Sequence, residues 1–280
     1  MQFTVKATCL ILSLASASMA SALNIADDEE FDRIASRLKG DWALGSWHTA
    51  LVSSRSPSFA YRRSGFAISH IQFRFDQQKG LAINEAINCF HEGMGERSVA
   101  EICPSEKSGS YLLIAGPRDE CRALPRGERG DTMLYPVIGT VTFANDTSLS
   151  MTPDGYVTRN GGQHQYIKCR PALARFVNRH TIAGSYVDAQ GRPYTFTEDG
   201  VATWNIVQYS YEVNLDYTLG GDDVFFLKSF DGGKILDTYG FVRSGDTLLV
   251  YNVGESESCE GSVRVGSPLM VLRKMKQGKR

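Results

Sequence analysis

One stretch of the chain, from Tyr209 to Leu219, alternates between large apolar or aromatic side chains and polar ones over eleven residues. Because successive side chains of a β-strand point to opposite faces, this alternation predicts a strand with one buried face and one solvated face. The stretch is longer than the usual strand of about five or six residues, which suits the wall of a curled antiparallel sheet or barrel.

The second half of the chain is predicted to be a series of strands joined by tight turns. Short connections rich in Gly and Asp, such as Asp199-Gly200 and Ser244-Gly245-Asp246, are typical of hairpins. Eight consecutive strands linked in this way form an up-and-down meander, and closing it into a barrel removes exposed strand edges. The strands expected beside Tyr209–Leu219 are Ser185–Asp188, Pro193–Thr197, Val201–Val207, Val224–Phe230, Lys234–Val242, Thr247–Val253 and Pro268–Lys274.

The first half is predicted to contain a similar set of strands after a short helix over Asp27–Arg37, whose acidic first turn suits the helix macrodipole. A polar loop is expected over Ser53–Ser64, and a loop-rich insertion over about residues 92–131, in which only Tyr111–Ala115 resembles a strand. A second helix is expected over Pro171–His180, because proline fits the first helical turn. The other predicted strands are Trp42–His48, Phe66–Phe75, Leu81–Phe90, Val137–Phe143, Ser148–Thr152 and Gln163–Cys169.

An internal repeat links the two halves. Residues 38–42 (LKGDW) resemble residues 182–186 (IAGSY), and each follows a predicted short helix. Residues 145–149 (NDTSL) likewise resemble residues 245–249 (GDTLL). The repeat predicts an all-β fold of two tandem up-and-down barrels, over residues 23–170 and 182–275, joined by a helical linker over 171–181 and followed by a basic tail at 276–280. The alternative is one large β-sandwich in which these similarities arise by chance.

The N-terminus has the features of an export signal. Lys6 is followed by an apolar run, and residues 20–22 (Ala-Ser-Ala) form a small-residue cleavage pattern, so we expect cleavage after Ala22 and a secreted or periplasmic chain. The apolar run is too short to span a bilayer, and no membrane span is expected elsewhere. The formal net charge of −1 gives no attraction to nucleic acid.

Five cysteines follow the predicted signal, and in an oxidising compartment they are candidates for disulfides. Sequence alone leaves the connectivity open. The preferred pairs are Cys89 with Cys103, across the following loop, and Cys121 with Cys169, which would tie the insertion to the last strand of the first barrel. Cys259 is then unpaired.

The pattern resembles the lipocalin and calycin superfamily, whose barrels begin with a short helix and a Gly-x-Trp on the first strand. Gly40-Asp41-Trp42 matches that motif, and Gly184-Ser185-Tyr186 is a weakened copy. The resemblance implies that a basic residue near the last strand packs on the aromatic ring and closes the barrel: Arg170 on Trp42, and Arg273 on Tyr186. It also implies a cup that binds a small molecule.

Aromatic residues suggest where a ligand would bind in the second barrel. Tyrosine combines apolar area with a hydroxyl, which suits a pocket for an amphipathic molecule. A core filled by these rings is the alternative. The predicted ligand-binding residues are Trp204, Tyr209, Tyr211, Tyr217 and Tyr239.

No catalytic signature emerges from the sequence: it has no nucleophile elbow, phosphate loop or dinucleotide fingerprint, and no metal or cofactor is predicted. The expected function is therefore non-catalytic binding of a small hydrophobic or amphipathic molecule. One alternative is a barrel enzyme of the isomerase, cyclase or lyase type, with His48 or His70 as the first candidates for catalysis. Another is a protein-binding module, such as a protease inhibitor or an effector, which would act through the insertion.

Overall fold

The computed structural model describes residues 28–64, 68–76, 80–87, 92–105, 107–115, 137–153, 163–204, 206–215, 217, 221–231, 233–255 and 262–275. The predicted export signal and basic tail lie outside these ranges, as do Cys89, Cys121 and Cys259. None of the helices within these ranges combines the length and apolarity needed to cross a membrane.

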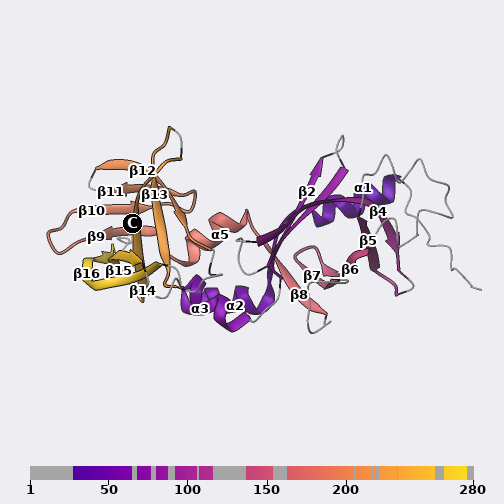
Figure 1. The fold of residues 1–280 in the computed structure, drawn as a ribbon, viewed down its shortest axis with the longest axis horizontal. Coiled ribbons are helices and arrows are strands. Elements are labelled where there is room, and N and C mark those ends of the chain that lie inside the picture. The colour runs from indigo at the N-terminus through magenta and orange to yellow at the C-terminus, as the bar shows by residue number, and fades with distance from the viewer. Residues whose placement is uncertain are drawn as a thin grey trace, which may run out of the picture.

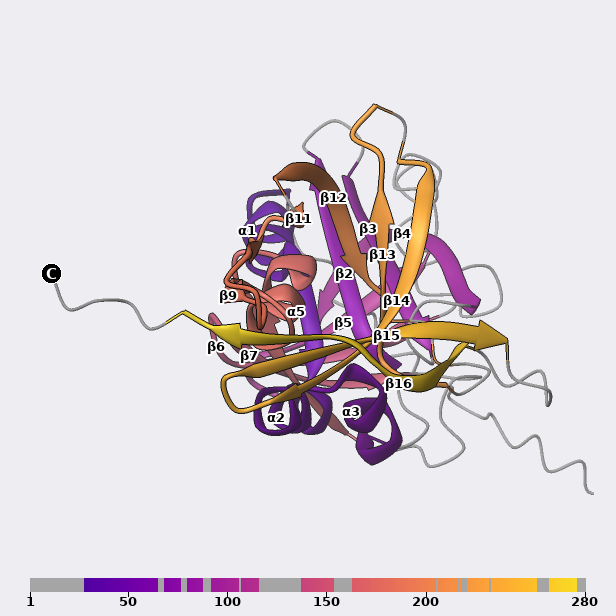
Figure 2. The same ribbon diagram turned by 90° about the vertical axis from the view of Figure 1, so that its left-hand side faces the viewer.

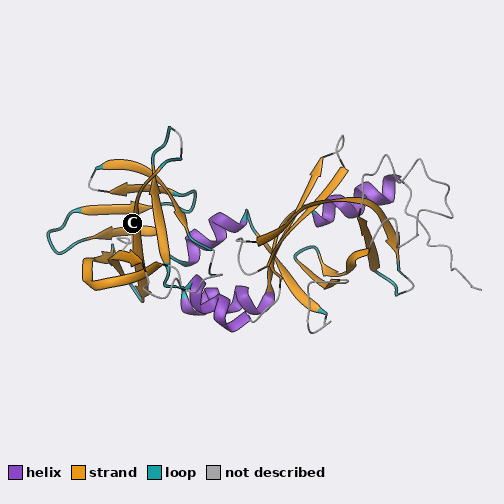
Figure 3. Cartoon of the chain, viewed as in Figure 1, coloured by secondary structure: helices purple, strands orange, loops and turns teal. Residues whose placement is uncertain are grey.

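The chain forms two eight-stranded antiparallel sheets (Figures 1 and 3). In the first sheet every strand pairs with the next one, and β1 also pairs with β8, so that the sheet closes on itself. The predicted all-β class is confirmed. The strands of the first sheet are β1 (Gly40–Leu44), β2 (Ile68–Asp76), β3 (Gly80–Ile87), β4 (Glu92–Pro104), β5 (Ser110–Ala115), β6 (Val137–Asn145), β7 (Ser148–Pro153) and β8 (His164–Cys169).

The second sheet repeats this order. Its first and last strands pair over two positions, Arg273 with Val187 and Lys274 with Tyr186. Figure 2 looks along the molecule with this sheet in front of the first. Its strands are β9 (Gly184–Val187), β10 (Pro193–Phe196), β11 (Val201–Trp204), β12 (Val207–Val213), β13 (Val224–Lys228), β14 (Ile235–Ser244), β15 (Thr247–Glu255) and β16 (Ser262–Lys274).

Four helices complete the described residues: α1 (Asp28–Leu38), α2 (Gly45–Ser54), α3 (Pro57–Ser64) and α5 (Leu173–His180). Helix α1 buries Phe31, Ile34, Ala35 and Leu38 on one face, as its periodicity predicts. Helices α2, α3 and α5 lie between the two sheets (Figures 1 and 3).

The predicted strand over Trp42–His48 is confirmed only for Trp42–Leu44, which belong to β1, because α2 begins at Gly45. The predicted loop over Ser53–Ser64 was wrong, because α3 and the end of α2 occupy most of these residues. Trp47 and Leu51 lie one helical turn apart and are both fully buried, which fixes the inner face of α2. Pro57 is the first residue of α3, and the Ser56 hydroxyl accepts the Phe59 N–H at 3.1 Å as an N-cap. Strand β4 also occupies part of the insertion that was predicted to be loop.

The long predicted strand ends early. Strand β12 stops at Val213, and Asn214, Leu215 and Tyr217 lie outside it. Tyr217 is buried there for a different reason: its hydroxyl donates to Asp223 Oδ1 at 3.1 Å, and its ring stacks on Tyr61 of α3 with centroids 6.1 Å apart. The burial of Tyr217 against α3 therefore produced part of the alternation that was predicted to belong to a strand.

The two Gly-x-aromatic motifs occupy equivalent positions. Gly40 and Gly184 open the first strand of each sheet with φ of 120° and 155°, a region that side chains disfavour. The Trp42 Nε1–H donates to Leu38 O at 2.6 Å, and the Tyr186 hydroxyl donates to Ile182 O at 2.9 Å. In both motifs the aromatic residue therefore bonds to the carbonyl four residues earlier, at the end of the preceding segment.

Cations cover both rings, but they are not the predicted ones. Lys168 Nζ lies 4.9 Å from the Trp42 ring centroid, and the Arg243 guanidinium carbon lies 5.1 Å from that of Tyr186. Arg170 and Arg273 are exposed instead. Lys168 pairs directly with Trp42 across β1 and β8, whereas Arg243 reaches Tyr186 from β14. Nearness to the last strand was therefore the wrong guide in the second sheet.

The second pair of repeat segments is also equivalent in the fold. Residues 145–149 connect β6 to β7, and residues 245–249 connect β14 to β15. Both connections join the sixth and seventh strands of their sheet.

Neither predicted disulfide is confirmed. Cys103 and Cys169 are buried, with exposures of 0% and 3%. Cys169 is a free thiol, contrary to the predicted bond to Cys121, because the packing around β8 encloses its side chain. Burial, with a smaller effect of the Asp41 charge, raises the pKa of this thiol to about 12. The pairing of Cys89 with Cys103 stays a prediction.

Candidate functional site

The interior of the second sheet is filled with aromatic rings. Trp204 on β11 stacks on Tyr239 on β14 with centroids 4.9 Å apart, although two strands separate them in the sheet. These two rings therefore meet across the inside of the sheet. Tyr194, Phe196, Tyr211, Phe225 and Phe241 belong to the same cluster.

Exposure of the inward-facing side chains changes steadily along the strands. On β12, Val207 is 50% exposed, Tyr209 is half-buried and Tyr211 is 4% exposed. On β14, Asp237 is exposed, Tyr239 is half-buried and Phe241 is fully buried. Because neighbouring strands are antiparallel, the starts of β12 and β14 lie at the same end of the sheet. That end, formed by Trp204, Val207, Tyr209, Asp237 and Tyr239, is called the open end.

The opposite end is sealed. Tyr186 is fully buried there and bonds to Ile182 O, with the Arg243 guanidinium against its ring and hydroxyl. The interior of the second sheet is therefore accessible at its aromatic end and closed at the opposite end.

Three of the five predicted ligand-binding residues lie at the open end: Trp204, Tyr209 and Tyr239. Tyr211 lies deeper, and its hydroxyl donates to Thr197 O at 2.5 Å, which gives it a structural role. Tyr217 lies outside the strands against α3. Val207 and Asp237 were missed. Asp237 has the same parity as Tyr239 in its predicted strand, so alternation marked it, whereas Val207 belongs to β12, which begins two residues before the predicted strand Tyr209–Leu219.

The open end contains one ionisable pair. The Tyr239 hydroxyl donates to Asp237 Oδ2 at 2.6 Å, and burial together with Asp237 raises the pKa of Tyr239. The phenol therefore stays protonated at neutral pH. This arrangement offers a stacking surface with a hydrogen-bonding edge.

The two candidate histidines, His48 and His70, pack against different rings. His48 on α2 stacks on Phe176 of α5 at 4.6 Å, and burial, with the nearby His180, lowers its pKa. His70 is 3% exposed and packs edge-on against Trp47 at 4.4 Å, and burial lowers its pKa to about 3. His164 lies on β8, in a separate surface depression.

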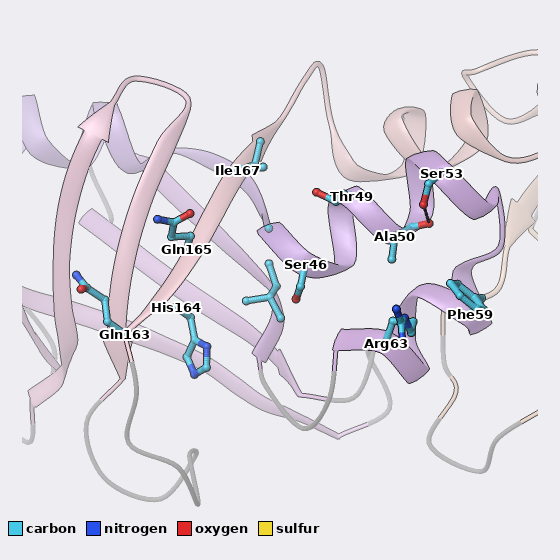
Figure 4. A pocket seen from close by; sticks show the side chains of 12 residues that line it. Ser46, Thr49, Ala50, Ser53, Phe59, Arg63, Gln163, His164, Gln165 and Ile167 are labelled. Carbon is cyan, nitrogen blue, oxygen red and sulfur yellow. Dashed lines mark hydrogen bonds between the residues drawn. The ribbon is translucent and has the colours of Figure 1, made fainter.

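That depression is lined by α2, α3 and β8 and has a volume of about 840 Å³. Figure 4 shows Ser46, Thr49 and Ser53 of α2 along it, with His164 of β8 and Arg63 of α3 nearby. It is wide and open, with no cluster of ionisable groups suited to catalysis. Within the described ranges, no group of three or more His, Cys, Asp or Glu side chains could hold a metal ion.

The fold and this geometry define an all-β chain of two curled antiparallel sheets, the second of which has an accessible aromatic end. Comparison with known proteins adds no relative: no family model, curated protein or solved structure matches the chain.

Proposed function

We propose that this protein binds a small hydrophobic or amphipathic molecule at the open end of the second sheet, without catalysis. The observation that carries the proposal is the gradient of exposure along β12 and β14 over the stacked pair Trp204–Tyr239. Stacked rings with partly exposed faces offer apolar area, and the Tyr239–Asp237 pair offers a polar contact.

The proposal extends to the architecture: each sheet is a lipocalin-like barrel, and the chain is a duplication of that unit. Support comes from the paired motifs, in which glycine with positive φ precedes an aromatic residue that bonds to the carbonyl four residues earlier. Support also comes from the cation over each ring. We further propose that the chain is exported, on the strength of its N-terminal sequence alone.

Non-catalytic binding is favoured over an enzyme because Asp237, the carboxylate of the open end, already accepts the Tyr239 hydroxyl. His70, whose pKa is about 3, is too weakly basic to serve as an efficient general base near neutral pH. A barrel enzyme and a protein-binding module acting through residues 92–131 remain the alternatives.

The test is native mass spectrometry of the protein purified from its natural host, followed by organic extraction of whatever is bound. We expect one small molecule per chain, which also raises the melting temperature when added back. Val207→Asp places a charge at the open end and should abolish the rise. Leu269→Asp is the matched control, since Leu269 is also 50% exposed but lies on β16. An empty protein whose melting temperature is unmoved by a library of lipids and aromatic compounds would count against the proposal.

A further inference from the structure

A second concave site lies between the two sheets, away from the open end. It has a volume of about 800 Å³, within the range of about 300–1,000 Å³ typical of ligand sites. Strands β1 and β2 form one wall, α5 forms another, and the β10–β11 turn and the end of β12 form the third. This inter-sheet groove lies at the closed end of the second sheet, because β12 runs towards it from the open end.

Apolar side chains from all three walls line part of the groove. They are Ile71 of β2, Leu173 and Val177 of α5, Tyr211 and Val213 of β12, and Leu215 just beyond it. Ile71 and Val177 are 1% exposed, so this surface belongs to the packed cores around it. Such a lining suits the apolar part of a ligand.

The walls are fixed to one another by hydrogen bonds. The Leu173 N–H donates to Asp41 Oδ2 at 3.0 Å, which ties α5 to the first sheet. The Asn178 side-chain amide donates to Glu198 O at 2.9 Å, which ties α5 to the β10–β11 turn. The groove is therefore formed without a ligand, as small-molecule sites usually are.

Carboxylates predominate among the charged groups of the groove, and most of them are neutralised. Asp199 pairs with Arg175 at 2.7 Å, Glu198 with Arg179 at 2.7 Å, and Glu212 with Lys228. Asp41 differs: it accepts hydrogen bonds from Gln72 Nε2 at 2.7 Å and from the Leu173 N–H, but no ion pair of the described residues involves it. Each of its oxygens has further capacity to accept a hydrogen bond.

We propose that the inter-sheet groove binds an amphipathic organic cation, with its ammonium group at Asp41 and its apolar part along Leu173, Val213 and Leu215. A charge-assisted hydrogen bond to a carboxylate is stronger than a neutral one, so the charge of the ligand decides affinity here. This site is separate from the open end. It takes a positively charged ligand, whereas a fatty acid carries a negative charge.

Three probes of matched shape test the charge preference: 4-phenylbutylamine, 4-phenylbutanol and 4-phenylbutyrate. Titration calorimetry on the full chain should show the amine binding at least tenfold more tightly than the carboxylate, with the alcohol between them. Asp41→Asn should remove the advantage of the amine over the alcohol. Equal affinities for the three probes, or an amine preference that survives Asp41→Asn, would overturn the proposal.

Asp41 also caps α5, so a second variant leaves the cap intact. Ala174 lines the groove and is exposed, and Ala174→Trp should fill the groove and weaken amine binding at least tenfold. Ala189→Trp, in the exposed β9–β10 turn, is the matched control and should bind normally. Amine binding that is unchanged in Ala174→Trp, or that is lost in Val207→Asp instead, would assign the amine elsewhere and refute the groove.

Discussion

The Asp223 carboxylate accepts the backbone N–H of Ser58 at 2.7 Å, so that the residue before β13 of the second sheet caps the first turn of α3. The relationship is reciprocal, since Asp41 of the first sheet accepts the N–H of Leu173 at the start of α5. A carboxylate at a helix N-terminus satisfies orphan donors and complements the macrodipole. The two halves are therefore joined by charge-assisted hydrogen bonds as well as by packing.

Replacing Asp223 should destabilise the protein. Asp223 is 6% exposed and also accepts the Tyr217 hydroxyl, so Asp223→Ala leaves two buried donors without this acceptor. We expect a loss of about 1–3 kcal/mol in the free energy of unfolding, measured by urea denaturation. Asp231→Ala, in an exposed turn, should change it by less than about 0.5 kcal/mol. Equal effects of the two variants would show that the cap contributes nothing.

A second prediction concerns Gly184, the glycine of the second Gly-x-aromatic motif. A methyl group at Gly184 would lie 2.9 Å from the Tyr186 hydroxyl, whereas one at Gly191 would meet nothing within 4 Å, and both residues have positive φ. Gly191→Ala should therefore cost only the backbone strain, about 1–2 kcal/mol. Gly184→Ala should cost more, because the Tyr186 ring must also move. Thermal unfolding of both variants checks the order, and a larger loss for Gly191→Ala would contradict the proposed packing.

Much of the fold was predictable because its signals are local. Gly-Asp turns and alternating side chains identified the second sheet. The repeated Gly-x-aromatic motif identified the first strand of each sheet. Helices α2 and α3 were missed because they bury few residues, although Ser56-Pro57 is a helix-start signal that the prediction overlooked. The cations over Trp42 and Tyr186 required the register of the strands. The inter-sheet groove depends on the packing of distant segments, which no local pattern encodes.

Burial of His70 predicts a loss of stability in acid. Its pKa is lowered from 6.5 to about 3 by burial, so below about pH 6.5 the unfolded chain binds a proton that the folded chain does not. The contribution of this group is fully present above pH 6.5 and falls by up to about 1.4 kcal/mol per pH unit below it. His48 and His180, whose pKa values are also lowered, act in the same direction.

Urea denaturation at pH 7.5, 6.0 and 5.0 measures this dependence. His48→Gln should reduce the slope only by the share of His48 and leave that of His70. Unfolding free energies that are constant from pH 7.5 to 5.0 would be incompatible with a buried, neutral His70.

The last prediction concerns Ile206, whose replacement should raise the free energy of unfolding rather than lower it. This β-branched residue precedes β12 with φ of 70° and is 86% exposed, so it carries backbone strain and little packing. Ile206→Asn should raise the free energy of unfolding by about 0.5–1 kcal/mol, because asparagine tolerates the left-handed region. Ile206→Gly should gain less, since glycine also increases the entropy of the unfolded chain. Val207→Gly, within the strand, is the control and should destabilise. Urea denaturation of the three variants decides the matter, and a loss of stability in Ile206→Asn would show that the isoleucine makes a stabilising contact despite its exposure.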